Sequence, residues 1–226
     1  MTEAPAWVQH LADSVRRLDA GSFLRGLPAP PESARDSAVL MLFGAGADEG
    51  ADGTDLVLIE RAHDMRSHAG QVAFPGGASD PGDDGPSMTA LREAQEEIGL
   101  DPTGVDVLVT LPRLWLPPSN FAVTPVVAWW REESPIGVVD AAEVASVLRA
   151  PVSGLVDPAH RFTVRHPSGY QGPGFAVTGP PGELVLWGFT AGVVDRVLHA
   201  AGLERPWDRS RSKPAPVPAA RPEPPR

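Results

Sequence analysis

A glycine-rich loop that leads into an acidic helix, residues 76–100, constrains this chain more than any other feature. Pro86 and Ser87 favour a helix start, with Ser87 as the N-cap, and Gly99 favours the helix end. At about 100° per residue, the apolar side chains share one face, which predicts packing on a sheet; they are Leu91, Ala94 and Ile98. We expect three carboxylates to project together from the opposite face: Glu93, Glu96 and Glu97.

Such a cluster of acids destabilises an isolated helix. Glu93 and Glu97 are four residues apart, so their charges repel each other. Crowded carboxylates also raise one another's pKa unless a cation lies among them. Hard divalent ions such as Mg²⁺ prefer oxygen ligands of this kind. Arg92, four residues before Glu96, can hold one acid in place. Taken alone, the glutamates fit a solvated acidic face better, because that is the commoner meaning of a Glu-rich helix.

The spacing of the acids resembles the Nudix box, the loop–helix signature of hydrolases that cleave nucleoside diphosphates linked to another group. The loop is one residue longer than the family pattern. Counting back from Arg92 assigns the family's first Glu to Asp84, whereas counting forward from Gly77 assigns it to Asp83, and both remain candidates. The second half matches at every fixed position: Arg92, Glu93, Ala94, Glu96, Glu97, Gly99 and Leu100.

The segment before this box is similar to the signature of coenzyme A pyrophosphatases, a Nudix subfamily. Val57 and Leu58 open the match and Ile59 replaces a Thr. Two nearby arginines suit phosphate oxygens, although two surface arginines alone would be unremarkable. The glycines would let backbone approach the substrate closely. The resemblance implies a substrate-binding role for Arg61, Arg66, Gly70, Phe74, Gly76 and Gly77.

The resemblance implies an α+β Nudix fold, a mixed sheet between helices (α/β/α). It also implies hydrolysis of coenzyme A, and of acyl derivatives, to 4′-phosphopantetheine and adenosine 3′,5′-bisphosphate. Mg²⁺ or Mn²⁺ would be held by Glu93, Glu97 and Glu96, with Arg92 in the catalytic set. Glu96 and Glu143 are alternative proton acceptors. Two other functions stay open: a Nudix hydrolase of ADP-ribose, NADH or a nucleoside triphosphate, and a nucleotide-binding scaffold without activity.

The rest of the chain divides into three expected parts: an N-terminal helix and linker (1–34), the Nudix domain (35–203) and a Pro-rich disordered tail (204–226). Trp7, Leu11, Val15 and Leu18 have helical spacing. We expect a helix over 140–148, capped by Asp140, and a C-terminal helix from Gly188. The expected strands cover 37–43, 56–59 (a hairpin with the first), 105–116, 122–130, 161–165 and 183–187, the last two joined by a Gly/Pro loop.

Composition narrows the functional classes. The 226 residues suit one domain with extensions, and the lack of cysteine excludes disulfides and thiolate metal sites. The net charge of −10 argues against nucleic-acid binding, which needs a basic field. No secretion signal or membrane-length apolar run is evident. We therefore expect a cytoplasmic enzyme with a small-molecule substrate and no nucleic-acid or membrane partner; a homodimer is compatible with the sequence.

Overall fold

The computed structural model describes residues 3–17, 28–46, 53–65, 68–179 and 182–216. A mixed sheet forms its centre, with β1 (Arg35–Ala45) antiparallel to β2 (Thr54–Arg61) and parallel to β7 (Phe121–Trp130). The strand order is β3-β2-β1-β7-β5, ending in β3 (Val72–Ala73) and β5 (Val105–Thr110). Three more strands pair with these: β4 (Gly76–Ala78) with β1, β6 (Leu114–Leu116) with β7, and β8 (Val144–Pro151) with β2.

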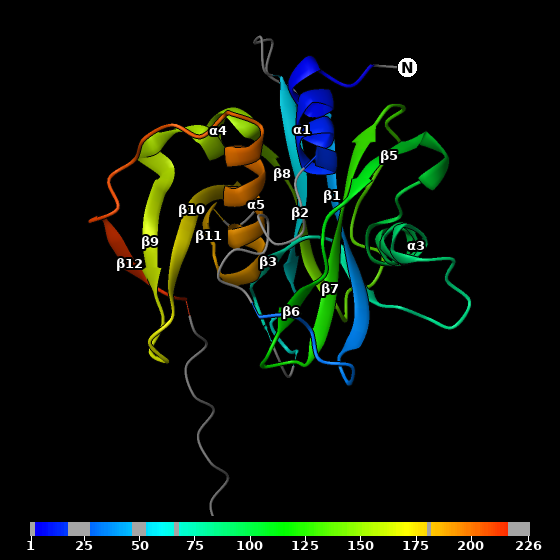
Figure 1. The fold of residues 1–226 in the computed structure, drawn as a ribbon, viewed down its shortest axis with the longest axis horizontal. Coiled ribbons are helices and arrows are strands. Elements are labelled where there is room, and N and C mark those ends of the chain that lie inside the picture. The colour runs from blue at the N-terminus through cyan, green and yellow to red at the C-terminus, as the bar shows by residue number, and fades with distance from the viewer. Residues whose placement is uncertain (1–2, 18–27, 47–52, 66–67, 180–181, 217–226) are drawn as a thin grey trace, which may run out of the picture.

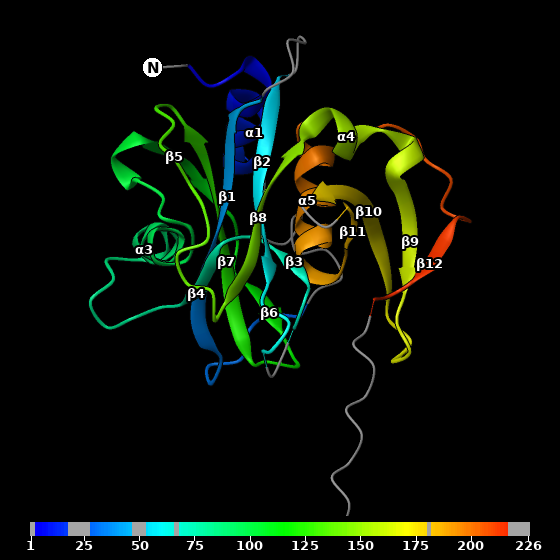
Figure 2. The same ribbon diagram turned by 180° about the vertical axis from the view of Figure 1, so that it is seen from behind.

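Helices cover both faces of this sheet, as the resemblance described above implies (Figures 1 and 2). α3 (Pro86–Ile98) covers one face, and α1 (Ala6–Arg17) and α5 (Gly188–Ala200) cover the other. Because both faces are buried, β2 reads as a continuous apolar run: Val57 and Ile59 pack toward α3, Leu56 and Leu58 toward the other helices. The fold is therefore the predicted α+β arrangement of a mixed sheet between helices.

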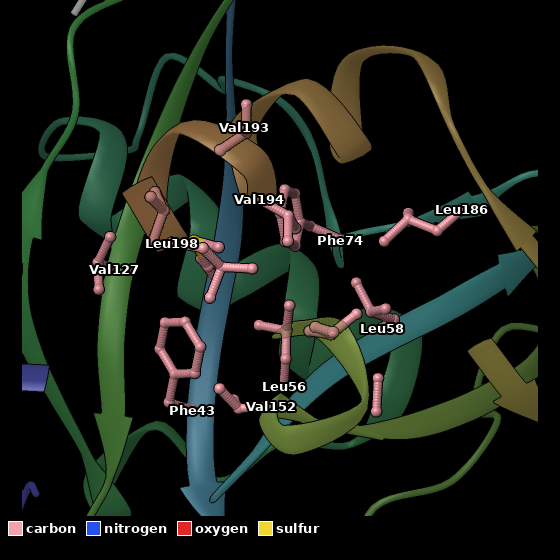
Figure 3. Packing of buried hydrophobic residues seen from close by; sticks show 14 of the residues in the cluster. Phe43, Leu56, Leu58, Phe74, Val127, Val152, Leu186, Val193, Val194 and Leu198 are labelled. Carbon is pink, nitrogen blue, oxygen red and sulfur yellow. The ribbon is translucent and has the colours of Figure 1, made fainter. Parts of the chain in front are cut away.

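The larger core lies on the α1/α5 side (Figure 3). Phe43, Leu58 and Phe74 from the sheet side meet Val194 of α5 there, all 2% exposed or less. The predicted N-terminal helix also contributes, through Val8, Leu11 and Val15. α1 is thus part of the same core as the strands, rather than an appendage to them.

A second sheet stands beyond α5 (Figure 1), in the order β11-β10-β9-β12. Its strands are β9 (Arg161–Arg165), β10 (Gln171–Gly179), β11 (Gly182–Leu186) and β12 (Ser212–Pro214). The predicted strands at 161–165 and 183–187 are present, but the expected loop between them contains β10. Gln171–Gly179 pairs with both neighbours, and these backbone hydrogen bonds outweigh its Gly and Pro content. Short helices complete the structure: α4 (Val152–Val156), Pro102–Gly104 and Pro158–His160.

Two local predictions need correction. The helix expected over 140–148 is wrong, because β8 begins at Val144 and pairs antiparallel with β2. Asp140 does accept a 2.8 Å hydrogen bond from the Ala142 N–H, but it caps a turn. The strand expected over 105–116 is divided into β5 and β6, with Pro112, which has no N–H for the ladder, between them.

The C-terminal segment departs from the disorder expected from Arg205 onward. β12 pairs parallel with β9, and Ala215 is buried beside Phe162 and Val164. Trp207 stacks on Arg161, with the guanidinium carbon 4.8 Å from a ring centroid. A strand partner and the contact of Trp207 with a buried arginine thus order a segment that has little apolar bulk. Residues 217–226 lie outside the described part of the chain.

Candidate active site

The acids of α3 differ in burial, which corrects the expectation that all three project from the face opposite the sheet. The buried stripe of the helix contains Ala90, Ala94 and Ile98. Glu93 and Glu97 each follow a stripe residue by three positions, so they flank the stripe at about 60°. The Glu97 residue is 2% exposed, whereas the Glu96 side chain is 59% exposed. The helix limits, and Gly99 as the left-handed C-cap, agree with the prediction; Gly85, not Ser87, is the N-cap.

Glu97 is the buried acid at the centre of the site. Its Oε2 accepts a 2.9 Å hydrogen bond from the Gly76 N–H, while its Oε1 is buried without a hydrogen-bond partner among the described residues. Burial raises the pKa of Glu97 to about 7, and the Gly76 N–H and the Arg61 charge only partly offset this. A buried carboxylate oxygen with no partner is a ready ligand for a cation.

Two glycines allow the close packing around these carboxylates, one against Glu93 and one against β1. A Cβ added to Gly77 would lie 2.4 Å from Glu93 Oε2. Gly76 has φ +148°, and a Cβ there would lie 2.4 Å from the Ala38 carbonyl oxygen. Only glycine fits either position without a shift in its surroundings. The backbone at Gly76 and Gly77 therefore approaches the acids of α3 closely.

Arg92 holds the acids and the loop together. Its Nη1 donates to Glu93 Oε1 at 2.9 Å and to Glu96 Oε2 at 3.1 Å. Its Nε and Nη2 donate to the two oxygens of Asp83 at 3.0 Å, and Nη2 also donates to the Ala78 carbonyl. All five N–H groups of the guanidinium are engaged. From the sequence, Arg92 is counted with the catalytic residues. Its contacts instead make it a residue that positions Glu93 and Glu96.

Asp83, rather than Asp84, is the loop acid that belongs to this network. Besides Arg92, its Oδ2 accepts a 2.8 Å hydrogen bond from the buried Thr89 hydroxyl. The Arg92 guanidinium and the Asp80 N–H hold the pKa of Asp83 well below its usual range. Asp84 is exposed, and its N–H contacts the Met88 sulfur. The spacing around Arg92 offered both acids equally, and it gave no signal for Thr89.

Arg61 and Glu143 form the other wall of the site. Their charged ends lie 3.8 Å apart, and the Ala62 N–H donates to the Glu143 carbonyl at 2.8 Å. Glu143 is close enough to raise the pKa of both Glu93 and Glu97. The N–H groups of Gly137 and Val139 donate to the last carbonyls of α3, those of Ile98 and Glu97. This loop, which sequence reasoning missed, brings Glu143 toward α3.

The remaining expected substrate residues have different positions. Arg66 lies outside the described residues. Gly70 has φ +67° and lies against the His63 ring. Phe74 is 2% exposed and packs in the core beside Val194 (Figure 3), which gives its side chain a packing role instead of the expected binding role.

A metal ion fits the chemistry of the acids. Within the described ranges, no three acidic or histidine side chains already converge at metal-binding distances. Glu97 Oε1 is nevertheless a buried oxygen without a partner, and Glu93 Oε2 lies in the gap that Gly77 leaves open. These oxygens, with Glu96 at the rim, are the hard donors that Mg²⁺ and Mn²⁺ prefer.

The chain is similar to several known proteins. The family profile described as the NUDIX domain matches residues 38–147. The "Uncharacterized Nudix hydrolase NudL" of Cronobacter sakazakii is 37% identical over 161 residues, which cover 67% of this chain and 77% of that protein. "Nudix hydrolase 15, mitochondrial" of Arabidopsis thaliana is 34% identical over 166 residues, 70% of this chain and 56% of that protein.

A solved structure of a MutT/nudix family protein from Enterococcus faecalis also resembles the chain. It is 17% identical, has a TM-score of 0.45, and the match covers 87% of this chain and 73% of that one. Of the helices that the structure describes, none has both the length and the apolar character needed to cross a lipid bilayer.

Proposed function

This chain belongs to the Nudix hydrolases, enzymes that act on nucleoside diphosphate derivatives, and we propose that its substrate is coenzyme A. The reaction would cleave the diphosphate to give 4′-phosphopantetheine and adenosine 3′,5′-bisphosphate. Acyl derivatives of coenzyme A would be cleaved at the same bond. The alternative, another nucleoside diphosphate derivative such as ADP-ribose or NADH, is an outcome of the test below.

The observation that carries the proposal is the position of the segment 61–77, whose sequence resembles the coenzyme A pyrophosphatase signature. Its first residue, Arg61, lies 3.8 Å from the Glu143 carboxylate, and its positive charge lowers the pKa of Glu97. Near its end, Gly76 donates to Glu97 and Gly77 leaves room for Glu93. Arg61, Gly76 and Gly77, which belong to the segment that resembles this signature, therefore border the acid cluster. A guanidinium in this position suits the negative oxygens of a diphosphate.

Glu93 and Glu97, with Glu96 at the rim, would hold Mg²⁺ or Mn²⁺. A bound ion neutralises the diphosphate and stabilises the charge that develops as water attacks phosphorus. Arg92 keeps Glu93 and Glu96 in fixed orientations, and Asp83 fixes Arg92 in turn. Arg61 would contribute positive charge on the phosphate side of the site.

Glu143 is our candidate for the carboxylate that takes the proton from the attacking water. Arg92 already binds Glu96, which points toward solvent. Glu143 lies close enough to raise the pKa of both acids that would hold the metal, Glu93 and Glu97. Its partner Arg61 is 3.8 Å away, which leaves its carboxylate free of a close hydrogen bond from that side chain. A general base must lie beside the reacting atoms, and Glu143 meets this requirement better than Glu96.

The test is product analysis with the full chain, Mg²⁺ or Mn²⁺, and a panel of coenzyme A, ADP-ribose, NADH and a nucleoside triphosphate. Preferred formation of 4′-phosphopantetheine and adenosine 3′,5′-bisphosphate would support the proposal. Preferred cleavage of another compound would show that coenzyme A is not the substrate and would identify that compound in its place. Binding of a nucleotide without cleavage, in folded protein, would favour a regulatory scaffold.

The variant Arg61→Lys tests whether Arg61 contributes more than its charge. It should raise KM for coenzyme A, because the lysine ammonium keeps the charge but cannot bind two phosphate oxygens side by side as a guanidinium does.

A further inference from the structure

Behind Arg61, on the opposite face of β2, lies a buried acid that the proposed chemistry does not use. Glu60 is 5% exposed, and its Oε2 accepts a 2.8 Å hydrogen bond from the Ser146 hydroxyl of β8. Its Oε1 lies 3.2 Å from Nε2 of His63. A buried carboxylate requires partners for both oxygens, and these two residues supply them.

This acid sits where the pairing of β2 with β8 changes register. Glu60 lies opposite Ser146, but Arg61 lies opposite Val144, so Ala145 is an extra residue in β8. Bulges of this kind re-aim the side chains beside them. Here the bulge lies directly before Arg61, whose guanidinium faces the acid cluster. The contacts that hold Glu60 in place therefore also hold the backbone from which the Arg61 side chain extends.

His63 connects this anchor to the far end of the loop that follows β2. A Cβ on Gly70 would lie 2.8 Å from His63 Nδ1, so the imidazole occupies the space that a side chain would need. The Gly70 N–H in turn donates to the Arg61 carbonyl at 3.1 Å, and the Arg61 N–H donates to the Gln71 carbonyl at 3.0 Å. The His63 ring thus lies between the Glu60 carboxylate and Gly70, whose N–H binds the Arg61 carbonyl.

We propose that His63 is a positioning residue, which ties the backbone at Gly70 to the buried Glu60 and so fixes the Arg61 guanidinium for phosphate binding. The inference rests on the proposed function of Arg61. It also gives Gly70 a role: its missing side chain admits the His63 ring. His63 itself, with 69% of its side chain exposed, contributes little to the core.

The experiment compares His63→Gln with wild type in steady-state hydrolysis by the full chain, using whichever panel compound it cleaves best. We expect KM to rise about tenfold while kcat changes little, because a loosened Arg61 weakens binding of the ground state and the transition state alike. His199→Gln is the matched control, since His199 also pairs with a glutamate, Glu204, at 2.7 Å, but on exposed α5 surface. It should leave both constants unchanged.

A double-mutant cycle separates positioning from a general structural effect. In an Arg61→Ala background, His63→Gln should raise KM no further.

A second pair of variants tests the contact between Gly70 and the His63 ring. Gly70→Ala should raise KM, and it should do so less in a His63→Ala background, where the ring that the new Cβ of residue 70 would meet is absent. Unchanged KM for His63→Gln, or equal effects with and without Arg61, would overturn the inference. Failure of coenzyme A as substrate would not affect this comparison, because the panel defines the substrate that is used.

Discussion

The Gly76 N–H donates a hydrogen bond to Glu97 Oε2, and this bond joins the glycine-rich strand to the most buried acid of the helix. It is the one hydrogen bond given to this carboxylate by the described residues. One N–H cannot offset the loss of water around a full charge. In the absence of metal, the folded chain therefore favours protonated Glu97, with a pKa of about 7 against an ordinary value of 4.5.

Glu97→Gln should consequently stabilise the metal-free protein at high pH. Between pH 4.5 and about 7 the unfolded chain loses this proton while the folded chain retains it, so wild type loses stability as pH rises, by up to about 3 kcal/mol. Gln is neutral throughout and can still accept from Gly76. Urea unfolding with a chelator should show the variant more stable than wild type at pH 8 and similar at pH 5. Turnover should be abolished.

The exposed Glu96→Gln serves as the control for that comparison. Its unfolding curve should follow the wild-type curve at both pH values. A stability difference between Glu97→Gln and wild type that is the same at pH 5 and pH 8 would show that burial of the Glu97 charge is not its cause.

Gly77→Ala should impair catalysis more than stability. The new Cβ would lie 2.4 Å from Glu93 Oε2, so the carboxylate must move away from its place beside Arg92. We expect the Mg²⁺ concentration for half-maximal activity to rise and kcat to fall, by about tenfold or more. Titration of activity with Mg²⁺ measures both. Gly82→Ala is the matched control, because nothing lies within 4 Å of its added Cβ; similar losses in the two variants would refute the explanation.

Asp83→Asn and Asp84→Asn should differ sharply although the residues are adjacent. Asn at 83 can accept only one of the two parallel hydrogen bonds from Arg92 and loses the charge that complements it. Arg92 would then be less fixed, and we expect kcat to fall about tenfold to a hundredfold through the acids it orients. Asp84→Asn should retain activity close to wild type. Equal kcat values for the two variants would mean that the loop acid does not act through Arg92.

Local sequence predicted α3 well, but it did not predict which acids α3 buries. The helix limits, the Gly99 cap and the pairing of Arg92 with Glu96 depend on residues close in sequence. The burial of Glu97 depends on Gly76, which is 21 residues away and reaches it through β4 pairing with β1. Likewise, the spacing could not choose between Asp83 and Asp84, because the choice depends on how the loop folds back on Arg92.

The mistaken helix at 140–148 has a similar origin. Asp140 with alanines and valines after it is typical of a helix start, and Asp140 does cap a turn. What decides the conformation is the pairing of Val144–Pro151 with β2, a partner some 85 residues earlier whose proximity no local pattern reveals. The disorder expected from Arg205 onward has the same origin. This segment is ordered by contacts with β9 and Arg161, which are distant in sequence.

Trp207→Leu should destabilise the fold without altering the acid cluster. Arg161 is 1% exposed, is paired with Asp195, and lies between the rings of Phe175 and Trp207. Removing one ring from a buried guanidinium should lower the free energy of unfolding by about 2 kcal/mol. Urea unfolding measures this, with Arg209→Gln as the control, because that exposed side chain contacts the same indole but should contribute under about 0.5 kcal/mol. Equal losses would show that the Arg161 stack is not the cause.

Glu143→Gln and Glu96→Gln discriminate between the two candidate proton acceptors. If Glu143 takes the proton from water, Glu143→Gln should lower kcat by about 10²–10⁴-fold with KM little changed, since Gln has nearly the same size and shape but cannot take a proton. Glu96→Gln should cost much less, because its carboxylate is bound to Arg92 at the exposed rim. The reverse pattern would assign the proton transfer to Glu96.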